Sequence, residues 1–154
     1  MIEKDIPGPA KVLGIAGLMP FIISTGLIFI LKEENGRLMV FDLLVHYAAV
    51  ILSFLGAVHW GVFMTSRNTH PTIHTKMWMG FGWSVVPALI AWIATQMVLM
   101  ASLVTLIVGF SAAFFFDVWS VKKGWTPSWY LQLRKYLTLI VLICLGIAIL
   151  KTRF

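Results

Sequence analysis

The sequence predicts an all-α membrane protein, a polytopic bundle of five transmembrane helices. Of its 154 residues, 60% are apolar and only 12% are charged, whereas about a quarter of the residues in a soluble domain carry a charge. The mean hydropathy is +0.92. The sequence has no alternating strand pattern, and a helix satisfies its own backbone hydrogen bonds in lipid. We therefore expect one integral membrane domain over residues 1–154.

The first two transmembrane helices are expected at residues 12–31 and 43–66. Both stretches lack Asp, Glu, Lys and Arg, and each has the roughly 20 residues that a helix needs to cross the hydrocarbon layer. Pro20 lies inside the first stretch, where its missing N–H removes one helix hydrogen bond. We expect a kink in the first helix at this position.

The third and fourth helices are expected in a single long uncharged stretch. Residues 77–116 carry no formal charge, and this length is about twice what one crossing requires. Thr95 and Gln96 form the most polar pair near the middle of the stretch. We therefore expect a hairpin at this pair, with helices at residues 77–94 and 97–116.

The fifth helix is expected at residues 131–150. Arg134 and Lys135 lie in its first turn. Long cationic side chains near the end of a membrane helix commonly extend toward the lipid head groups. We therefore expect both side chains to snorkel to the membrane surface.

The distribution of cations predicts the orientation. Twelve Lys and Arg residues against six Asp and Glu residues give a net charge of +6, which in a membrane chain indicates topology and contact with anionic lipid rather than nucleic acid. Eight flanking cations lie on the side of the N-terminus (Lys4, Lys11, Arg67, Lys76, Lys122, Lys123, Arg134, Lys135) and four on the other side (Lys32, Arg37, Lys151, Arg153). The positive-inside rule then places the N-terminus in the cytoplasm, or in the matrix of an organelle, and the C-terminus outside. The first apolar stretch is too long for a cleaved signal peptide.

The histidines do not predict a metal or haem site. His46 and His59 are thirteen positions apart in the second expected helix, which leaves their side chains about 140° apart around the axis and about 20 Å apart along it. His70 and His74 are spaced for zinc if their loop is helical, but the loop offers no third Cys, Asp or Glu ligand. We therefore predict no metal, and the sequence does not identify a cofactor.

A candidate ligand site is predicted on the side of the N-terminus. An ionisable residue at membrane depth is costly unless it has a partner or a function. The predicted topology brings His59, Asp117 and Arg134 to the same leaflet. Trp60, Trp83 and Trp129 are expected on that side too, and aromatic rings can form the walls of a pocket.

The same residues also have a structural interpretation. Tryptophans at a membrane interface form an aromatic belt, and Asp117 with Arg134 can be an ion pair that only fixes helix packing. In the second helix, a stripe of small and polar side chains is expected to be a packing seam. Its members are His46, Ala49, Ser53, Gly56 and Trp60.

Three classes of function remain open from these residues. The first is a non-enzymatic binding or accessory protein, with an inner-leaflet aromatic pocket for a lipid, quinone or tetrapyrrole, or with a surface for self-association or for a larger membrane complex. The second is a small transporter or channel. The third is a membrane enzyme with His59 as general base oriented by Asp117. No catalytic residue is assigned, since the sequence lacks a nucleophile elbow, a phosphate loop and a carboxylate pair.

Two segments carry a resemblance to a known family. The segment YAAVILSFLGAVHWG, Tyr47 to Gly61, and the segment PSWYLQLRKYLT, Pro127 to Thr138, resemble two elements of a family of small membrane proteins of unknown function. That family includes transmembrane protein 69 of mitochondria. The resemblance extends over most of the chain and implies a multi-span protein of the bacterial or mitochondrial inner membrane. It implies no reaction.

The architecture is also similar to that of the tryptophan-rich sensory proteins, or translocator proteins. These have about the same length, five helices and many tryptophans, and they bind porphyrins and cholesterol-like ligands. Their Trp-Pro pattern is approached only by WTPSWY at Trp125 to Tyr130. No binding residue is therefore transferred from that family, and a shared fold does not imply a shared function.

Overall fold

The computed structural model describes residues 5–66 and 77–152. The regular secondary structure of these residues is helical, and no strand occurs among them. The six helices are α1 (Gly8–Ala16), α2 (Met19–Ile30), α3 (Glu34–Ser66), α4 (Met77–Thr95), α5 (Leu99–Lys122) and α6 (Ser128–Lys151).

Five helical stretches in the described residues are long and apolar enough to cross a membrane. Four are single helices, and the fifth is formed by α1 and α2 together. The predicted all-α bundle of five transmembrane helices is therefore confirmed. The expected hairpin at Thr95 and Gln96 is present too, because α4 ends at Thr95 and α5 begins at Leu99.

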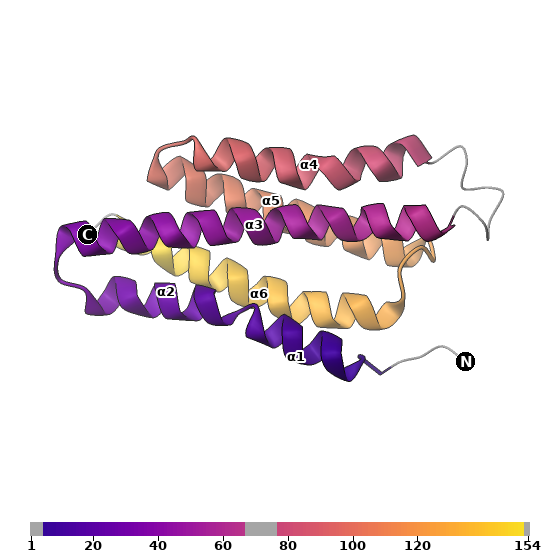
Figure 1. Cartoon of the computed structure of the whole chain (residues 1–154), viewed down its shortest axis with the longest axis horizontal. Coiled ribbons are helices and arrows are strands. Elements are labelled where there is room, and N and C mark those ends of the chain that lie inside the picture. Colours follow the sequence, from indigo (N-terminus) through magenta and orange to yellow (C-terminus); the bar gives the residue numbers. More distant parts are fainter. Residues whose placement is uncertain (1–4, 67–76, 153–154) are drawn as a thin grey trace.

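The helices run alternately up and down, and α3 lies at the centre of the bundle (Figure 1). It packs against α2, α4 and α5, while α6 packs against α5, α2 and α1. We call the end of the bundle that holds the start of α1 the N side, and the opposite end the C side. The ends of α3 and α5 and the starts of α4 and α6 also lie on the N side (Figure 1).

The first span is broken, which corrects the expectation of one helix over residues 12–31. α1 ends at Ala16 and α2 begins at Met19, with Pro20 in its first turn. Pro20 has no N–H to donate to the preceding turn, so the break lies where proline predicts a kink. The Tyr47 hydroxyl donates a hydrogen bond of 2.9 Å to the Gly17 carbonyl at the break. The Tyr47 side chain of α3 therefore supplies a hydrogen-bond donor to a backbone carbonyl at the break in the first span.

The second span begins earlier than the expected residue 43, since α3 starts at Glu34. Asp42 lies inside this helix, and its side chain is 74% exposed. A charged residue at the surface does not end a helix. The uncharged stretch therefore marks the hydrocarbon crossing, and the helix itself continues beyond it.

α3 and α4 approach closely at Gly56. A Cβ atom at this position would collide with the backbone carbonyl oxygen of Ser84 and would lie 3.3 Å from the Pro87 ring. Glycine is therefore required for this contact, as in other membrane helix pairs. The predicted seam is only partly correct, because Ala49 and Gly56 are buried while His46 and Trp60, at its two ends, are exposed.

The connection between α5 and α6 folds back onto the bundle. Gly124 has φ of +72°, which glycine adopts without strain. The Trp125 N–H then donates a hydrogen bond of 3.0 Å to the Ser120 carbonyl, as in a Schellman cap. This cap returns the Trp125 ring to the N side, where it packs 4.6 Å from the Trp119 ring, centroid to centroid.

Candidate functional site

Three ionisable side chains from three different helices meet on the N side of the bundle. His59 of α3 donates through Nε2 to Asp117 Oδ1 at 2.8 Å, and Arg134 of α6 donates through Nε to Asp117 Oδ2 at 2.8 Å. The exposed fractions are 1% for His59, 2% for Asp117 and 5% for Arg134. We call these three residues the triad. Both oxygens of the α5 carboxylate therefore have a buried donor.

The triad lies below the end of the bundle rather than at it. Its residues are separated from the nearest ends of α3, α5 and α6 by seven, five and six residues, respectively. At 1.5 Å per residue, this places them about 8–10 Å inside the helix ends. Charges at such a depth are costly, and mutual pairing offsets part of that cost.

Aromatic rings cover the triad. The His59 ring packs edge to face against Phe116 at 4.8 Å, and Phe116 stacks on Trp83 at 4.5 Å. Trp119 extends this cluster from Phe116 at 5.2 Å, and Trp125 follows it. These rings exclude water from the hydrogen bonds of Asp117, which strengthens charge pairing in a medium of low dielectric constant.

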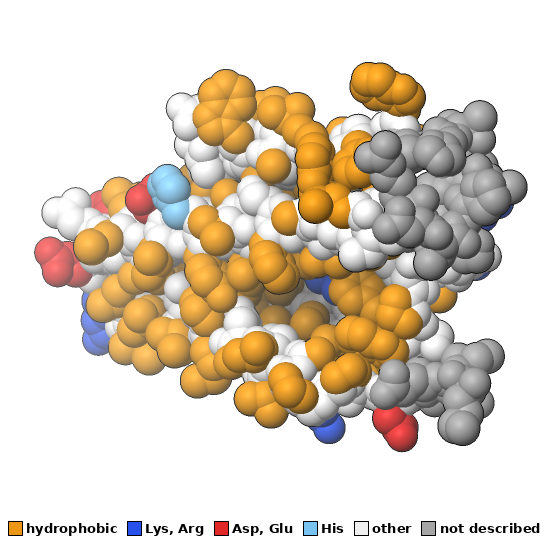
Figure 2. All heavy atoms as spheres, turned by 45° about the vertical axis from the view of Figure 1, so that its right-hand side comes forward, with side chains coloured by type: hydrophobic (Ala, Val, Ile, Leu, Met, Phe, Trp, Pro, Cys, Tyr) orange, Lys and Arg blue, Asp and Glu red, His pale blue; other side chains and the backbone are white. Residues whose placement is uncertain are grey.

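A cavity of about 400 Å³ adjoins the triad. It lies between α1, α2, α3, α5 and α6, and Arg134 is the one Lys, Arg, Asp or Glu residue among the described residues that line it. Figure 2 shows blue atoms in a hollow of the otherwise hydrophobic surface. The lining residues are Ala10, Leu13, Gly14, Gly17, Leu18, Phe21, Ile51, Phe54, Leu55, Val58, Phe110, Trp129, Tyr130, Leu133, Arg134, Leu137 and Val141.

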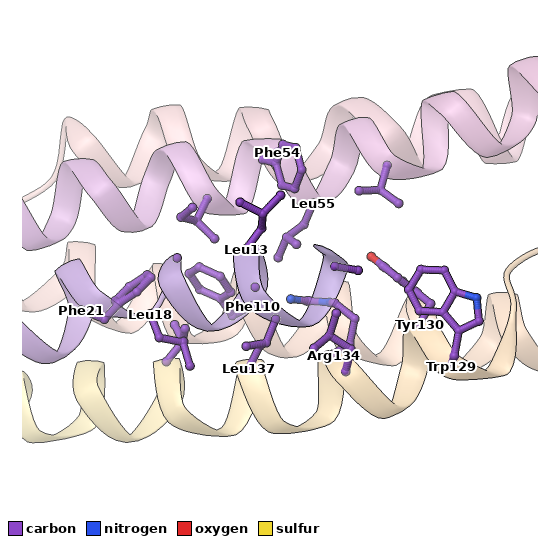
Figure 3. A pocket seen from close by; sticks show the side chains of 17 residues that line it. Leu13, Leu18, Phe21, Phe54, Leu55, Phe110, Trp129, Tyr130, Arg134 and Leu137 are labelled. Atoms are coloured by element: carbon purple, nitrogen blue, oxygen red, sulfur yellow. The ribbon is translucent and has the colours of Figure 1, made fainter. Parts of the chain in front are cut away.

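The cavity is elongated and its two ends differ. Trp129, Tyr130 and Arg134 lie toward one end, and Phe21 and Leu18 lie at the other (Figure 3). Nearly all of the lining between them is aliphatic or aromatic. The cavity therefore has a polar end and an apolar end, which is the shape that an amphiphile requires.

Two buried polar atoms at the polar end have no hydrogen-bond partner among the described residues. They are Arg134 Nη2 and the Tyr130 hydroxyl, and Figure 3 shows nitrogen of Arg134 directed into the cavity. A buried donor without a partner costs free energy, more so when it is charged. Arg134 thus joins the two features, because its Nε donates to Asp117 and its side chain lines the cavity.

His59 is linked to the cavity only through the triad. It does not line the cavity, and its Nδ1 has no partner among the described residues. Since a carboxylate oxygen only accepts hydrogen bonds, the hydrogen between His59 and Asp117 is on Nε2. His59 can therefore hold Asp117 in place, and Asp117 holds Arg134.

The structure assembles part of the predicted site. His59, Asp117 and Arg134, which the predicted topology places in one leaflet, are in contact in the structure, and Trp129 lines the cavity beside Arg134. Trp60 and Trp83 do not line the cavity. Trp60 is 45% exposed and packs on Phe81, whereas Trp83 packs on Phe116, so these two rings do not form the expected walls.

The prediction that Arg134 snorkels to the membrane surface is wrong. Its side chain is buried and bonded to Asp117. A carboxylate on the adjacent helix α5 offers a closer partner than the head groups do, and pairing lowers the cost of burying the guanidinium. Lys135, the neighbouring residue, is exposed.

Tyr130 and the lining residues of α1 were not predicted. A signal for Tyr130 does exist, because it lies four residues before Arg134 in α6 and therefore on the same face of that helix. Among the described residues, no group of three His, Cys, Asp or Glu could hold a metal ion. His70 and His74 lie outside the described residues.

Comparisons with known proteins agree with this architecture. The family described as "Protein of unknown function (DUF3429)" matches residues 6–150. The chain belongs to this family. It is 35% identical over 144 residues to Transmembrane protein 69 of Xenopus tropicalis and 29% identical over 142 residues to Transmembrane protein 69 of Mus musculus.

The matched region is a part of each relative. The alignments cover 92% and 90% of this chain but 54% of each relative, so the chain spans about half the length of the curated relatives it matches. No solved structure matches the chain. The comparisons therefore identify a family of transmembrane proteins and no activity.

Proposed function

We propose that this membrane protein binds a single membrane amphiphile in the cavity beside the triad. The observation that carries the proposal is the buried side chain of Arg134, which lines an otherwise apolar cavity and whose Nη2 has no hydrogen-bond partner among the described residues. The volume of about 400 Å³ is in the range of small-molecule sites. A lipid or quinone would place its oxygen atoms at Arg134 and Tyr130 and its tail toward Phe21.

The triad holds the side chain of Arg134 in position for ligand binding. Arg134 has a flexible side chain, and immobilising such a side chain during binding costs entropy. The 2.8 Å hydrogen bond to Asp117, which also accepts a hydrogen bond from His59, orders the Arg134 side chain before the ligand binds. We assign His59 and Asp117 to positioning Arg134, and Arg134, Tyr130 and Trp129 to the ligand.

A tetrapyrrole fits this cavity less well than a lipid or quinone. A porphyrin carries two acidic groups, and among the described lining residues only Arg134 offers a formal positive charge. Among the described lining residues there is also no His, Cys or Met to coordinate a metal in the ring. The proposal therefore needs neither an iron ligand nor a reaction at His59.

Native mass spectrometry of the gently solubilised protein tests the proposal. We expect a bound small molecule in the wild-type protein and its loss in Leu137→Trp, which fills the cavity. Leu139→Trp is the matched control, because Leu139 lies on the same helix, is 55% exposed and does not line the cavity. Equal retention in the two variants, or no bound molecule in the wild-type protein, would overturn the proposal.

We also propose that the N side faces the cytoplasm of a bacterium or the matrix of a mitochondrion. The eight-to-four excess of flanking cations supports this orientation. In this orientation the polar end of the cavity lies toward the inner leaflet. Reporter fusions at both ends of the chain test it, and a C-terminal reporter that is active inside would contradict it.

A further inference from the structure

We infer that the ligand held at Arg134 has an uncharged head group with an acceptor oxygen, such as the carbonyl of a quinone or an ester, and that the cavity rejects anionic amphiphiles. The inference rests on the proposed function, because it specifies the ligand of the same cavity. It is carried by the charges around Arg134 and by the hydrogen-bonding capacity that remains there.

The free hydrogen-bonding groups require an acceptor. A guanidinium can only donate hydrogen bonds, and the Tyr130 hydroxyl can donate or accept. Neither Arg134 Nη2 nor the Tyr130 hydroxyl has a partner among the described residues. A ligand oxygen that accepts from Arg134 would form a charge-assisted hydrogen bond, which is stronger than a neutral one. An amine or a plain hydrocarbon cannot form it.

The charges of the triad already balance. Arg134 contributes one positive charge and Asp117 one negative charge, joined at 2.8 Å. His59 donates through Nε2, while Nδ1 has no partner among the described residues. A charged imidazole would bury a second N–H without an acceptor, so the neutral form fits these surroundings better. The triad then carries no net charge.

No second cation among the described residues compensates an incoming anion. Lys11 and Lys135 are the cations nearest in sequence to the lining residues; both are exposed, and neither lines the cavity. An anionic head group would share the one guanidinium with Asp117, and two carboxylates around one cation repel each other at low dielectric constant. An uncharged carbonyl gains the same hydrogen bond without that repulsion.

Competition with amphiphiles of matched chain length tests the inference. Wild-type protein in nanodiscs of uncharged lipid would be incubated with methyl palmitate, an alkylbenzoquinone, an alkyl sulfonate that stays anionic at every working pH, and hexadecane. We expect the ester, the quinone or both to be retained about tenfold better than the sulfonate or the hydrocarbon, a ratio that corresponds to about 1.4 kcal/mol. The carbonyl compound that is retained shows whether the acceptor oxygen belongs to an ester or to a quinone.

A charge variant provides the decisive readout. Asp117→Asn removes the negative charge and leaves Arg134 uncompensated, so the preference should invert and the sulfonate should be retained better than the ester. Lys135→Gln is the matched control, because it removes an exposed cation outside the cavity and should leave the ratio unchanged. A merely structural role of Asp117 would weaken all ligands equally and would not invert the ratio.

The outcomes separate the two proposals. If the wild-type protein is folded and retains none of the four compounds, the proposed function fails. If it retains the sulfonate better than the ester and the quinone, the cavity binds amphiphiles but the inference about charge is overturned. Should Asp117→Asn fail to assemble, the Asp117→Asn/Arg134→Met double variant replaces it, because methionine has no N–H to donate. With both charges removed, that variant must lose the advantage of the carbonyl compounds over hexadecane, and a retained advantage overturns the inference.

Discussion

The two histidines of α3 each pair with an aspartate, but in opposite surroundings. Near the start of the helix, His46 Nδ1 lies 3.2 Å from Asp42 Oδ1, and the two side chains are 57% and 74% exposed. Near the end, His59 Nε2 lies 2.8 Å from Asp117 Oδ1, and the exposed fractions are 1% and 2%. The first pair is formed within one turn, and the second joins residues 58 positions apart.

This difference shows what a histidine–aspartate pair contributes in a membrane bundle. The Asp42–His46 pair can form in any conformation in which α3 is helical, and exposed pairs of this kind contribute little to stability. The triad forms only when α3, α5 and α6 adopt one rotation and one depth relative to each other. A buried pair adds little net stability of its own. We interpret the triad as a device that fixes the arrangement of three helices and of Arg134.

The largest expected effect comes from removing the acid at the buried end. Asp117→Leu should lower the free energy of unfolding by about 3–5 kcal/mol, because it leaves Arg134 charged and buried without a counter-charge. Asp42→Leu should change it by less than about 1 kcal/mol, since that pair is exposed. Thermal or denaturant unfolding of the two variants in the same detergent measures the contrast. Equal losses of unfolding free energy in the two variants would show that the buried and the exposed pair contribute alike.

A second variant distinguishes charge from packing at the buried end. Adding Arg134→Met to Asp117→Leu removes the uncompensated cation, so the double variant should recover about 2–4 kcal/mol of the loss. The same unfolding measurement reports the coupling between the two positions. If the double variant is as unstable as Asp117→Leu, the loss comes from the shape of the side chains and not from charge.

The histidines themselves should differ by a smaller amount. His59→Ala removes the donor to Asp117 Oδ1 and should cost about 1–3 kcal/mol, whereas His46→Ala should cost less than about 0.5 kcal/mol. We also expect His59→Ala to weaken ligand retention while the helices stay assembled, because Arg134 loses part of its support. Native mass spectrometry of both alanine variants, with unfolding in parallel, checks the two expectations. Unchanged ligand retention in His59→Ala would remove His59 from the positioning of Arg134.

The placement of the three triad residues in one leaflet was predictable, because burying charge is costly. Uncharged stretches of the sequence locate the five spans, and the limits of these spans place His59, Asp117 and Arg134 at similar depth. An ionisable residue at that depth needs a partner, and the three are one another's partners. The same argument does not predict where the Arg134 side chain points. Extending to the membrane surface and pairing with Asp117 both lower the free-energy cost of a charged guanidinium in the membrane, and the sequence does not decide between them.

The position of the cavity was not predictable, for a different reason. The residues that line the cavity depend on how each helix is rotated about its own axis. Most of the spans are apolar around their whole circumference, so the sequence pattern does not indicate this rotation. Leu137 lines the cavity and Leu139 faces outward, although both are leucines of α6. The break in the first span brings α1 over the cavity. Pro20 indicates that break, but not the direction of α1 after it.

The smallest expected effect tests whether the C-side half of α3 also carries a long-range polar contact. Tyr47 follows the exposed His46, yet its hydroxyl donates to the Gly17 carbonyl at the break between α1 and α2. Tyr47→Phe keeps the edge-to-face contact with Phe21 at 5.1 Å and removes only the hydrogen bond. It should cost about 0.5–1.5 kcal/mol, the usual contribution of one such bond.

This loss should be confined to the N-terminal span. The backbone amides of α1 should exchange hydrogen faster in Tyr47→Phe, because the open carbonyl at Gly17 loses its donor and α1 can change its angle to α2. Tyr136→Phe is the matched control, since Tyr136 is 65% exposed on α6. If the two variants show the same exchange in α1, the break is held by packing alone. Faster exchange in Tyr47→Phe together with weaker ligand retention would show that the angle of α1 shapes the cavity, because Leu13 and Gly14 of that helix line it.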